Sequence, residues 1–285
     1  MSKTPAQSER AHCADLVRTF DYARYATALF APAEHRDALL ALYAFNVEIA
    51  RVREQVTQPL AGEIRLQWWD DVLAGKPAGE AGGHPVASRL LDVIDVYQLS
   101  KATLSELVAA HRFGLYDEPI QTVAELEGYL DETAGKLFTI AARIQGERSP
   151  LLQAVAHHAA LAYGAMTVID ALPREASRKR LLVPVELLTR FGAKPESIFA
   201  GKASPELCDV VRALADGART HLAEAMSLLP DINPFARSGF LVLALIPPRL
   251  RQVAKVGYDP FKLPPRSRLR RLWTIWRASR SWRAL

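Results

Sequence analysis

The chain has 285 residues, of which 49% are hydrophobic and 24% are charged, and its formal net charge is +5. This composition is ordinary for a soluble globular protein with a sizeable core. The charge is uneven, because residues 266–285 contain seven arginines and no acidic residue, whereas residues 1–265 sum to −2. The basic character is therefore C-terminal, which argues against a nucleic-acid groove across the body and excludes nucleic acid as an expected partner.

The terminal and apolar segments exclude further classes. Residues 1–13 lack the apolar core of a secretory signal and the Arg-rich amphipathicity of a mitochondrial transit peptide. The longest apolar run, residues 240–248, is far shorter than the ~20 residues that span a bilayer. Cys13 and Cys208 stand far apart without a metal-binding spacing, so we expect two reduced thiols. These features predict a cytoplasmic protein that is not integral to a membrane.

Apolar residues recur at helical spacing along most of the chain, and strand-like alternation is scarce. The predicted helices cover residues 8–30, 32–56, 60–75, 86–99, 101–116, 123–145, 150–172, 184–191, 205–229, 235–256 and 268–282. Gly75 is suited to end the third helix, and the Gly- and Pro-rich residues 76–85 form the clearest loop. The pattern predicts a single all-α domain, with helices around a central core or cavity.

Three segments, 21–46, 129–137 and 164–184, carry motifs that appear together in one order. The first is aromatic-rich and continues into Ala-Leu-Tyr-Ala-Phe, the second begins with Tyr129, and the third ends with a basic run and a proline. As a set they resemble the squalene/phytoene synthase superfamily. The residues in register are Tyr25, Leu29, Pro32, Arg36, Ala41 through Phe45, Tyr129, Ala134, Gly135, Gly164, Arg180 and Pro184. The resemblance implies an isoprenoid-synthase-like helical domain with a central cavity.

Enzymes of this superfamily couple two prenyl diphosphates, and the resemblance implies two aspartate clusters that hold Mg²⁺ against the leaving diphosphate. In this chain the first cluster falls on Ala50, Arg51 and Glu54, and the second falls on Ala171 and Glu175. Two single glutamates leave most of the protein ligands for several Mg²⁺ ions missing. We therefore expect no metal and no cofactor.

Two neighbouring residues also bear on the second cluster. Pro173 is expected to break the helical turn between its two positions. Asp170 lies one position out of register, which is about 100° around a helix from the ligand face.

The run from residue 42 to 69 resembles a particular branch of the superfamily, which includes the mitochondrial complex I assembly factor and its bacterial relatives. The residues that carry this resemblance are Asn46, Glu48, Arg51, Glu54, Gly62, Arg65, Gln67, Trp68 and Trp69. It implies a non-catalytic role in assembling a respiratory complex, peripheral on the inner membrane, with respiratory complex subunits or assembly proteins as partners. The alternative is a divergent Mg²⁺-dependent prenyl transferase that uses Glu54 and Glu175.

The candidate cavity is expected to bind a lipid or prenyl ligand, whose anionic group would meet arginines. Its candidate lining residues are Tyr43, Phe45, Asn46, Glu48, Arg51, Arg65, Gln67, Trp68, Tyr129 and Arg180. If the family fold holds, Arg51 and Arg65 are expected to lie near each other. Around Trp68 and Trp69 two interpretations stay open, because Asp70 and Asp71 belong either to a polar site or to the solvated face of an amphipathic helix.

The basic run at residues 178–180 allows two interpretations. Residues 178–180 form either a solvated helix end or, at Arg180, a phosphate contact. The adjacent His157 and His158 are not expected to place both rings on one helix face, so a zinc site is not expected.

The C-terminal segment, residues 266–285, is set apart from the domain formed by residues 1–265. On a helical wheel Leu269, Leu272, Trp273 and Trp276 share one face, with Arg270 and Arg277 beside them. A basic helix with tryptophan at its apolar edge is typical of a helix that lies in an anionic membrane surface. A terminal helix that docks on the domain with its arginines outward fits the pattern equally well.

Overall fold

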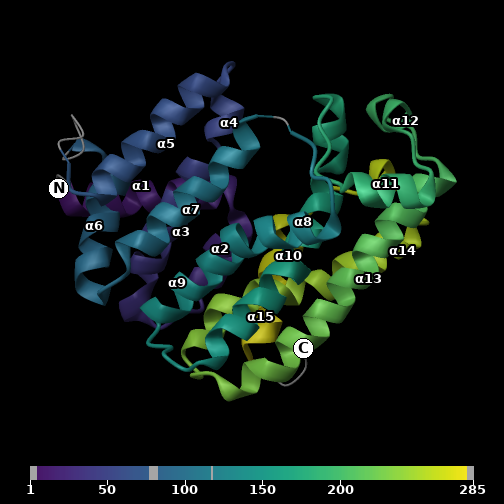
Figure 1. Ribbon diagram of the computed structural model, residues 1–285. Coiled ribbons are helices and arrows are strands. Elements are labelled where there is room, and N and C mark those ends of the chain that lie inside the picture. The colour runs from purple at the N-terminus through teal and green to yellow at the C-terminus, as the bar shows by residue number, and fades with distance from the viewer. Residues whose placement is uncertain (1–4, 77–82, 117, 281–285) are drawn as a thin grey trace.

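The computed structural model describes residues 5–76, 83–116 and 118–280 (Figure 1). No strand occurs within these ranges, which confirms the predicted all-α fold. The first helices are α1 (Pro5–Phe20), α2 (Tyr22–Ala28), α3 (Ala33–Ala50), α4 (Val52–Gln55), α5 (Pro59–Leu73), α6 (Pro85–Tyr97) and α7 (Lys101–Arg112). The later ones are α8 (Val123–Leu130), α9 (Lys136–Ile144), α10 (Leu151–Ser177), α11 (Val185–Phe191), α12 (Pro195–Phe199), α13 (Pro205–Leu228), the 3₁₀ helix η5 (Ala236–Leu245), α14 (Ile246–Lys255) and α15 (Arg268–Arg280).

Two clusters of buried apolar side chains meet along α9. One cluster joins α1, α3, α5, α6 and α7, and the other joins α10, α13, η5 and α14. Leu137 and Ile140 of α9 belong to the first cluster, whereas Phe138 and Ala142 belong to the second. Figure 1 shows the corresponding halves side by side, with α10 and α13 as the long helices of the second. Because α9 buries side chains on both faces, it joins the two halves into one core.

Three predicted helices are interrupted in the structure. The first breaks at Asp21, whose carboxylate accepts a hydrogen bond from the backbone N–H of Arg24 (3.1 Å) and so caps α2. The second breaks at Arg51, between α3 and α4. The third contains a π-helical turn, Asp131–Gly135, between α8 and α9. These breaks depend on caps and local turns. The spacing of apolar residues, from which the helices were predicted, does not show them.

The expectation that Pro173 breaks its helical turn is wrong, because α10 continues through Pro173 to Ser177. Proline removes one helical hydrogen bond, but the buried side chains on both sides of it hold this helix in place. After α10 the chain reverses at Lys179, which has a left-handed φ of +57°. The backbone N–H of Arg180 then bonds to the carbonyl oxygen of Glu175 (2.9 Å). This reversal returns Arg180 to the end of α10.

Other predicted segments differ in smaller ways. The helix expected over residues 235–256 consists of η5 followed by α14, and α12 was not expected. Both Cys13 and Cys208 are free thiols. Within the residues that the structure describes, no helix has the length and apolarity needed to cross a membrane. Most of the predicted loop 76–85 and the end of the C-terminal segment, including Trp282, lie outside the described residues.

Candidate functional site

The two glutamates that replace the aspartate clusters lie close to one another, where α4 meets the C-terminal end of α10. Arg174 joins them, since its guanidinium lies 3.4 Å from a carboxylate oxygen of Glu54 and 3.0 Å from one of Glu175. Residues 54 and 175 are 121 positions apart in the chain, so the fold alone brings these carboxylates together. The structure therefore has one acidic site in which each side chain comes from a different helix.

Three further arginines complete the site. Arg178 and Arg51 lie 3.6 and 3.7 Å from the carboxylate of Glu54, and Arg180 lies 2.6 Å from that of Glu175. Arg51 also stacks over the ring of Phe20, with its guanidinium carbon 3.4 Å from the ring centroid. We call Arg51, Glu54, Arg174, Glu175, Arg178 and Arg180 the arginine–glutamate cluster. Its four guanidinium groups exceed its two carboxylates, so the cluster carries a net positive charge.

The two carboxylates differ in burial. The side chain of Glu175 is 7% exposed and that of Glu54 is 28% exposed. Burial and the charge of Glu175 together raise the pKa of the Tyr129 phenol above its ordinary value. Tyr129 packs beside Phe113, with the ring centroids 5.8 Å apart. Of the two acidic side chains, Glu175 is therefore the one set into the protein, next to an aromatic wall.

The donor set of this cluster does not fit Mg²⁺. Magnesium needs hard oxygen ligands in an octahedral arrangement, but both carboxylates here are held by guanidinium groups. Two carboxylates are also fewer than the ion assembly of a diphosphate-releasing site uses. Among the described residues, no group of three or more His, Cys, Asp or Glu side chains is placed to hold a metal ion. No chemical step through a metal follows from this geometry.

Sequence reasoning missed Arg174 and Arg178. The signal was present, since both flank Glu175 within one basic stretch. The expected break at Pro173 concealed it, because these arginines reach Glu54 only when α10 continues past the proline. The interpretation of residues 178–180 as a solvated helix end is therefore incomplete, since Arg178 and Arg180 bind carboxylates.

The aromatic residues proposed for the cavity serve mainly as core. Phe45 is fully buried and packs edge-on against Trp69, with centroids 4.9 Å apart. Tyr43 is also buried, and burial raises the pKa of its phenol. Asn46 is half-buried on α3. These side chains stabilise the N-terminal half of the molecule.

A small cavity of about 190 Å³ lies between α3, α4 and α5. It is lined by Glu48, Val52, Gln55, Arg65, Trp68, Trp69 and His84. Arg65 contacts Gln55 across it, whereas Arg51 does not line it and faces Phe20. The structure thus gives the two arginines that were expected to be neighbours different partners.

The aspartates after Trp69 are engaged on the protein surface. Asp70 lies 2.7 Å from Arg112 of α7, which also binds Glu63. Asp71 accepts a hydrogen bond from Gln67 (3.1 Å) and pairs with Lys76 (3.4 Å). Gln67 is exposed and Asp71 is half-buried, and the two bond to each other rather than lining a walled polar site. The interpretation as an amphipathic helix is therefore the better one, and Asp70 ties α5 to α7.

The interior where α2, α9 and α10 meet is occupied by Arg24. This buried arginine is paired with Asp21 (2.9 Å) and lies within 5.9 Å of the ring centroids of Tyr43, Phe138 and Tyr163. Phe138 is also stacked on Phe240, with centroids 5.2 Å apart. Packed side chains therefore fill this part of the helical domain.

The adjacent histidines of α10 do gather their rings, contrary to the expectation. His157 and His158 have centroids 5.1 Å apart, and His158 lies 3.0 Å from His221 of α13, Nδ1 to Nδ1. His157 instead bonds to Asp131 (2.8 Å). Because α10 and α13 pack against each other, His221 of α13 meets the histidines of α10. The positions of two residues on a single helix do not predict such a contact.

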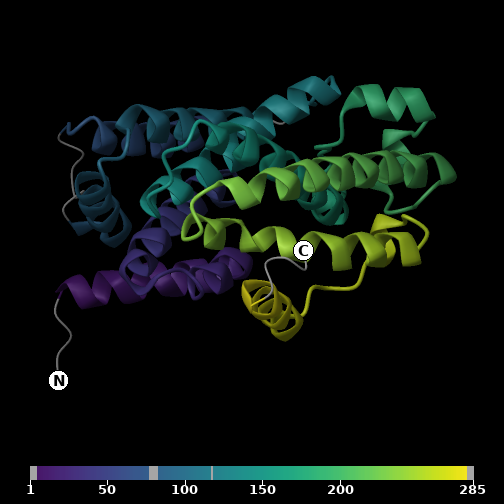
Figure 2. The ribbon, with the colours of Figure 1, turned by 90° about the horizontal axis from the view of Figure 1, so that it is seen from below.

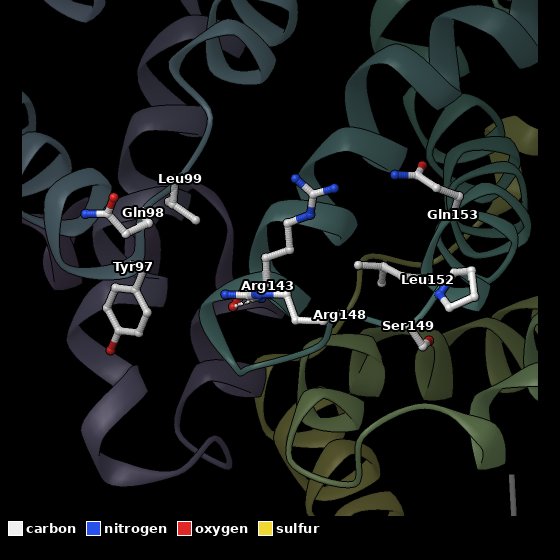
Figure 3. A pocket seen from close by; sticks show the side chains of 9 residues that line it. Tyr97, Gln98, Leu99, Arg143, Arg148, Ser149, Leu152 and Gln153 are labelled. Carbon is white, nitrogen blue, oxygen red and sulfur yellow. Dashed lines mark hydrogen bonds between the residues drawn. The ribbon is translucent and has the colours of Figure 1, made fainter.

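A cavity of about 410 Å³ lies at the opposite end of α10 from Glu175. Figure 3 shows Arg143 extended between Leu99 and Gln153. Arg148 turns back and donates a hydrogen bond to the backbone carbonyl of Arg143 (2.8 Å). None of the residues proposed from the sequence lines this cavity.

The C-terminal helix α15 packs against α2 and η5 on one face of the molecule, as Figure 2 shows. Ile275 and Ala278 are its buried residues, and Leu272 is partly buried. Trp273 and Trp276 remain 56% and 42% exposed. The helix is therefore docked on the domain, but its tryptophans point outward.

Comparison with known proteins identifies relatives of this chain. The family model for squalene/phytoene synthase matches residues 17–277. The chain is 29% identical over 254 residues to NADH dehydrogenase (ubiquinone) complex I, assembly factor 6, of Bos taurus, with 88% of this chain and 75% of that protein covered.

Two solved structures share the fold. A dehydrosqualene synthase in complex with ligand has a TM-score of 0.85 and 18% identity, over 99% of this chain and all of that one. Squalene synthase HpnC from Alicyclobacillus acidocaldarius has a TM-score of 0.77 and 19% identity, over 91% of this chain and 98% of that one.

Proposed function

The chain belongs to the squalene/phytoene synthase family, and we propose that it is a non-catalytic member that assists assembly of a respiratory membrane complex of the complex I type. The relatives from Bos taurus and Homo sapiens, which are named as complex I assembly factor 6, support this role, since the similarity extends over 88% and 95% of this chain. The expected partners are subunits or assembly proteins of that complex, and the expected location is peripheral on the inner membrane.

The arginine–glutamate cluster is the observation that carries the proposal. At the positions where the family's metal-binding aspartates would lie, this chain places Glu54 and Glu175, and arginines hold both carboxylates. A carboxylate that is paired with a guanidinium group is already neutralised, so a Mg²⁺ ion would have to displace the arginine. The cluster instead ties α4 to the end of α10 and presents positive charge, to which the anionic group of a lipid or prenyl ligand is suited.

A second function, Mg²⁺-dependent coupling of prenyl diphosphates, has one observation in its favour. Arg174 holds Glu54 and Glu175 close together. A catalytic site of this family would likewise bring together carboxylates from two helices. It requires the arginines to withdraw and Mg²⁺ to take their place, and for this reason we rank it second.

Complementation of a gene deletion tests the proposal and separates the two functions. We expect deletion to lower the amount and activity of complex I in the organism that encodes this chain, and the wild-type gene to restore both. Glu54→Gln keeps the shape of the more exposed of the two glutamate side chains, so a non-catalytic protein carrying it should restore complex I fully. Unchanged complex I levels after deletion, or failure of a folded Glu54→Gln protein to complement, would contradict the proposal.

A further inference from the structure

A cavity of about 380 Å³ lies between α14, α15 and the linker that joins them. We call it the α14–α15 cavity. It is lined by Leu245, Pro248, Arg249, Gln252, Pro264, Pro265, Arg266, Ser267, Arg270, Arg271, Trp273 and Thr274. Four arginines thus share one cavity with apolar side chains and with a tryptophan at its edge. This combination suits a ligand that has both an anionic and an apolar part.

The arginines of this cavity are incompletely neutralised. Asp170 of α10 pairs with Arg249 (2.6 Å) and Arg266, and so supplies one carboxylate for two guanidinium groups. Burial lowers the pKa of both arginines, and of Arg271, from the ordinary arginine value. Arg270 and Arg271 add two more positive charges. The wall therefore has an excess of positive charge that an anion would stabilise.

Two hydrogen-bonding groups of the cavity are available to such an anion. The Nε of Arg271 is buried and has no hydrogen-bond partner among the residues that the structure describes. Its Nη2 donates to the backbone carbonyl of Arg266 (3.2 Å), which fixes the guanidinium plane. The guanidinium of Arg270 is exposed, and within the described residues no hydrogen bond or ion pair involves it. A buried donor without a partner is costly, so a phosphate oxygen there would be favoured.

The outer face of α15 continues the cavity as an apolar and aromatic surface. Leu269, Trp273 and Trp276 are 78%, 56% and 42% exposed, and they recur at helical spacing along one side of α15. Arg277 and Arg280 lie over the rings of the two tryptophans, each with its guanidinium carbon 5.2 Å from the centroid. Figure 2 shows α15 on the outside of the molecule. Trp273 belongs both to this face and to the cavity.

α15 leaves its two largest apolar side chains on the outside. Ile275 and Ala278 are buried against the domain, while Trp273 and Trp276 face outward. This exposure leaves about half of the surface of each tryptophan unburied, although its burial is ordinarily favourable. The helix is also strongly cationic, since Arg268–Arg280 contains five arginines and no acidic residue. Tryptophan next to arginine suits the boundary between lipid headgroups and acyl chains.

We propose that the α14–α15 cavity binds the phosphate of an anionic phospholipid, while Leu269, Trp273 and Trp276 enter the interface of the same bilayer. The proposal deepens the peripheral membrane location given above and rests on it. Positive charge in excess of the one carboxylate of Asp170 favours an anionic membrane over a protein partner. The continuity of the cavity with the tryptophan face favours a lipid over a free anion, because a soluble phosphate gains nothing from the apolar side.

Vesicle binding of the full chain tests this proposal. Flotation with vesicles of phosphatidylcholine alone and of phosphatidylcholine with phosphatidylglycerol should give binding to the anionic vesicles only, with a blue shift of tryptophan fluorescence. Arg270→Glu should weaken binding by at least about tenfold, since the charge reversal removes one favourable contribution and adds one unfavourable contribution. The matched control is Arg251→Glu, an exposed arginine of α14 outside the cavity, which should weaken it by less than about threefold.

Trp273→Ala tests the apolar face separately. Binding should fall by about tenfold, whereas Phe235→Ala, which removes an aromatic side chain 64% exposed elsewhere, should leave it unchanged. Circular dichroism and thermal unfolding confirm that each variant is folded. Equal weakening by Arg270→Glu and Arg251→Glu would refute the cavity as the site, and competition by millimolar inorganic phosphate would show a free-anion site instead. Absent vesicle binding together with lowered complex I after gene deletion would overturn this inference and leave the assembly role intact.

Discussion

Two arginine-rich regions of this molecule differ in how their positive charge is used. In the arginine–glutamate cluster, the four arginines surround two carboxylates, and the buried Glu175 is held between two of them. In the α14–α15 cavity, two of the four arginines, Arg249 and Arg266, share the single carboxylate of Asp170. In the first region every arginine is paired with a carboxylate, and these pairs fix two helices. The second retains an excess and opens beside exposed tryptophans.

The comparison teaches that the number of arginines does not determine what a site can do. The ratio of arginine to carboxylate, the burial of each pair and the surface next to it distinguish an internal clamp from a site for an anion. Both regions involve α10, since Glu175 lies near its end and Asp170 lies a little more than one turn earlier. Substitutions on this one helix should therefore separate the two regions.

The largest expected effect comes from Glu175→Gln. It leaves the largely buried guanidinium of Arg180 without its carboxylate, so the free energy of unfolding should fall by about 3–5 kcal/mol. Urea unfolding measures this fall. Glu54→Gln is the control, because its pairs are more exposed and should be worth no more than about 1 kcal/mol. Equal effects of the two substitutions would contradict the difference in burial between the carboxylates.

Asp170→Asn should affect the second region in two opposite directions. Unfolding free energy should fall by about 2–3 kcal/mol, because Arg249 and Arg266 lose their shared carboxylate. Affinity for anionic vesicles should rise about fivefold, since one negative charge leaves the cavity wall. Asp209→Asn, which removes an exposed carboxylate paired with Arg212, should change neither quantity appreciably. Loss of vesicle binding in a folded Asp170→Asn protein would count against the cavity.

A third prediction concerns pH and lies outside both regions, so it provides a reference for them. His84 accepts a hydrogen bond from the backbone N–H of Ala87 (3.3 Å) and caps α6 through its neutral imidazole. Burial lowers the pKa of His84, so the folded state binds fewer protons than the unfolded state does. Stability should therefore fall by about 1 kcal/mol as pH decreases from 7.5 to 5.5, through the ordinary histidine pKa of about 6.5.

His84→Asn isolates this contribution, because asparagine retains the cap but does not titrate. Its unfolding free energy should depend less on pH than that of the wild type over the same range. An unchanged slope would show that protonation of other histidines accounts for the acid loss of stability.

The smallest expected effect is at Lys179, whose left-handed φ of +57° returns Arg180 to Glu175. Lys179→Gly should raise the unfolding free energy by about 0.5–1 kcal/mol, because glycine adopts this conformation without a Cβ penalty. Lys179→Ala retains the penalty and should be close to neutral. A stabilisation by alanine equal to that by glycine would point to relief of charge repulsion among Arg178, Lys179 and Arg180 instead.

Much of the fold was predictable from the sequence, because apolar periodicity and the ordered family motifs constrain it strongly. Sequence comparison also located Glu54 and Glu175 as the remaining acidic residues. It did not reveal their partners, since Arg174 and Arg178 reach Glu54 only through a helix that continues past Pro173. Such contacts depend on tertiary packing, which overrides the local preference of proline.

The C-terminal helix shows the same limit. The wheel placed Leu272 with the tryptophans, but Leu272 faces the domain while Trp273 and Trp276 face outward. The two interpretations, docking and membrane contact, were alternatives in the sequence, and the docked helix leaves an outer face for the second. Which face of a helix meets its neighbour depends on the shape of the neighbouring surface, here α2 and η5.

The most direct test of the central claim, that arginines rather than Mg²⁺ neutralise the carboxylates at the end of α10, is diphosphate release. Purified protein is incubated with farnesyl or geranylgeranyl diphosphate and Mg²⁺, and the released diphosphate is quantified against a reaction without protein. We expect no release above that background. Release that requires Mg²⁺ and is abolished in a folded Glu54→Gln variant would contradict the claim and establish the prenyl transferase instead.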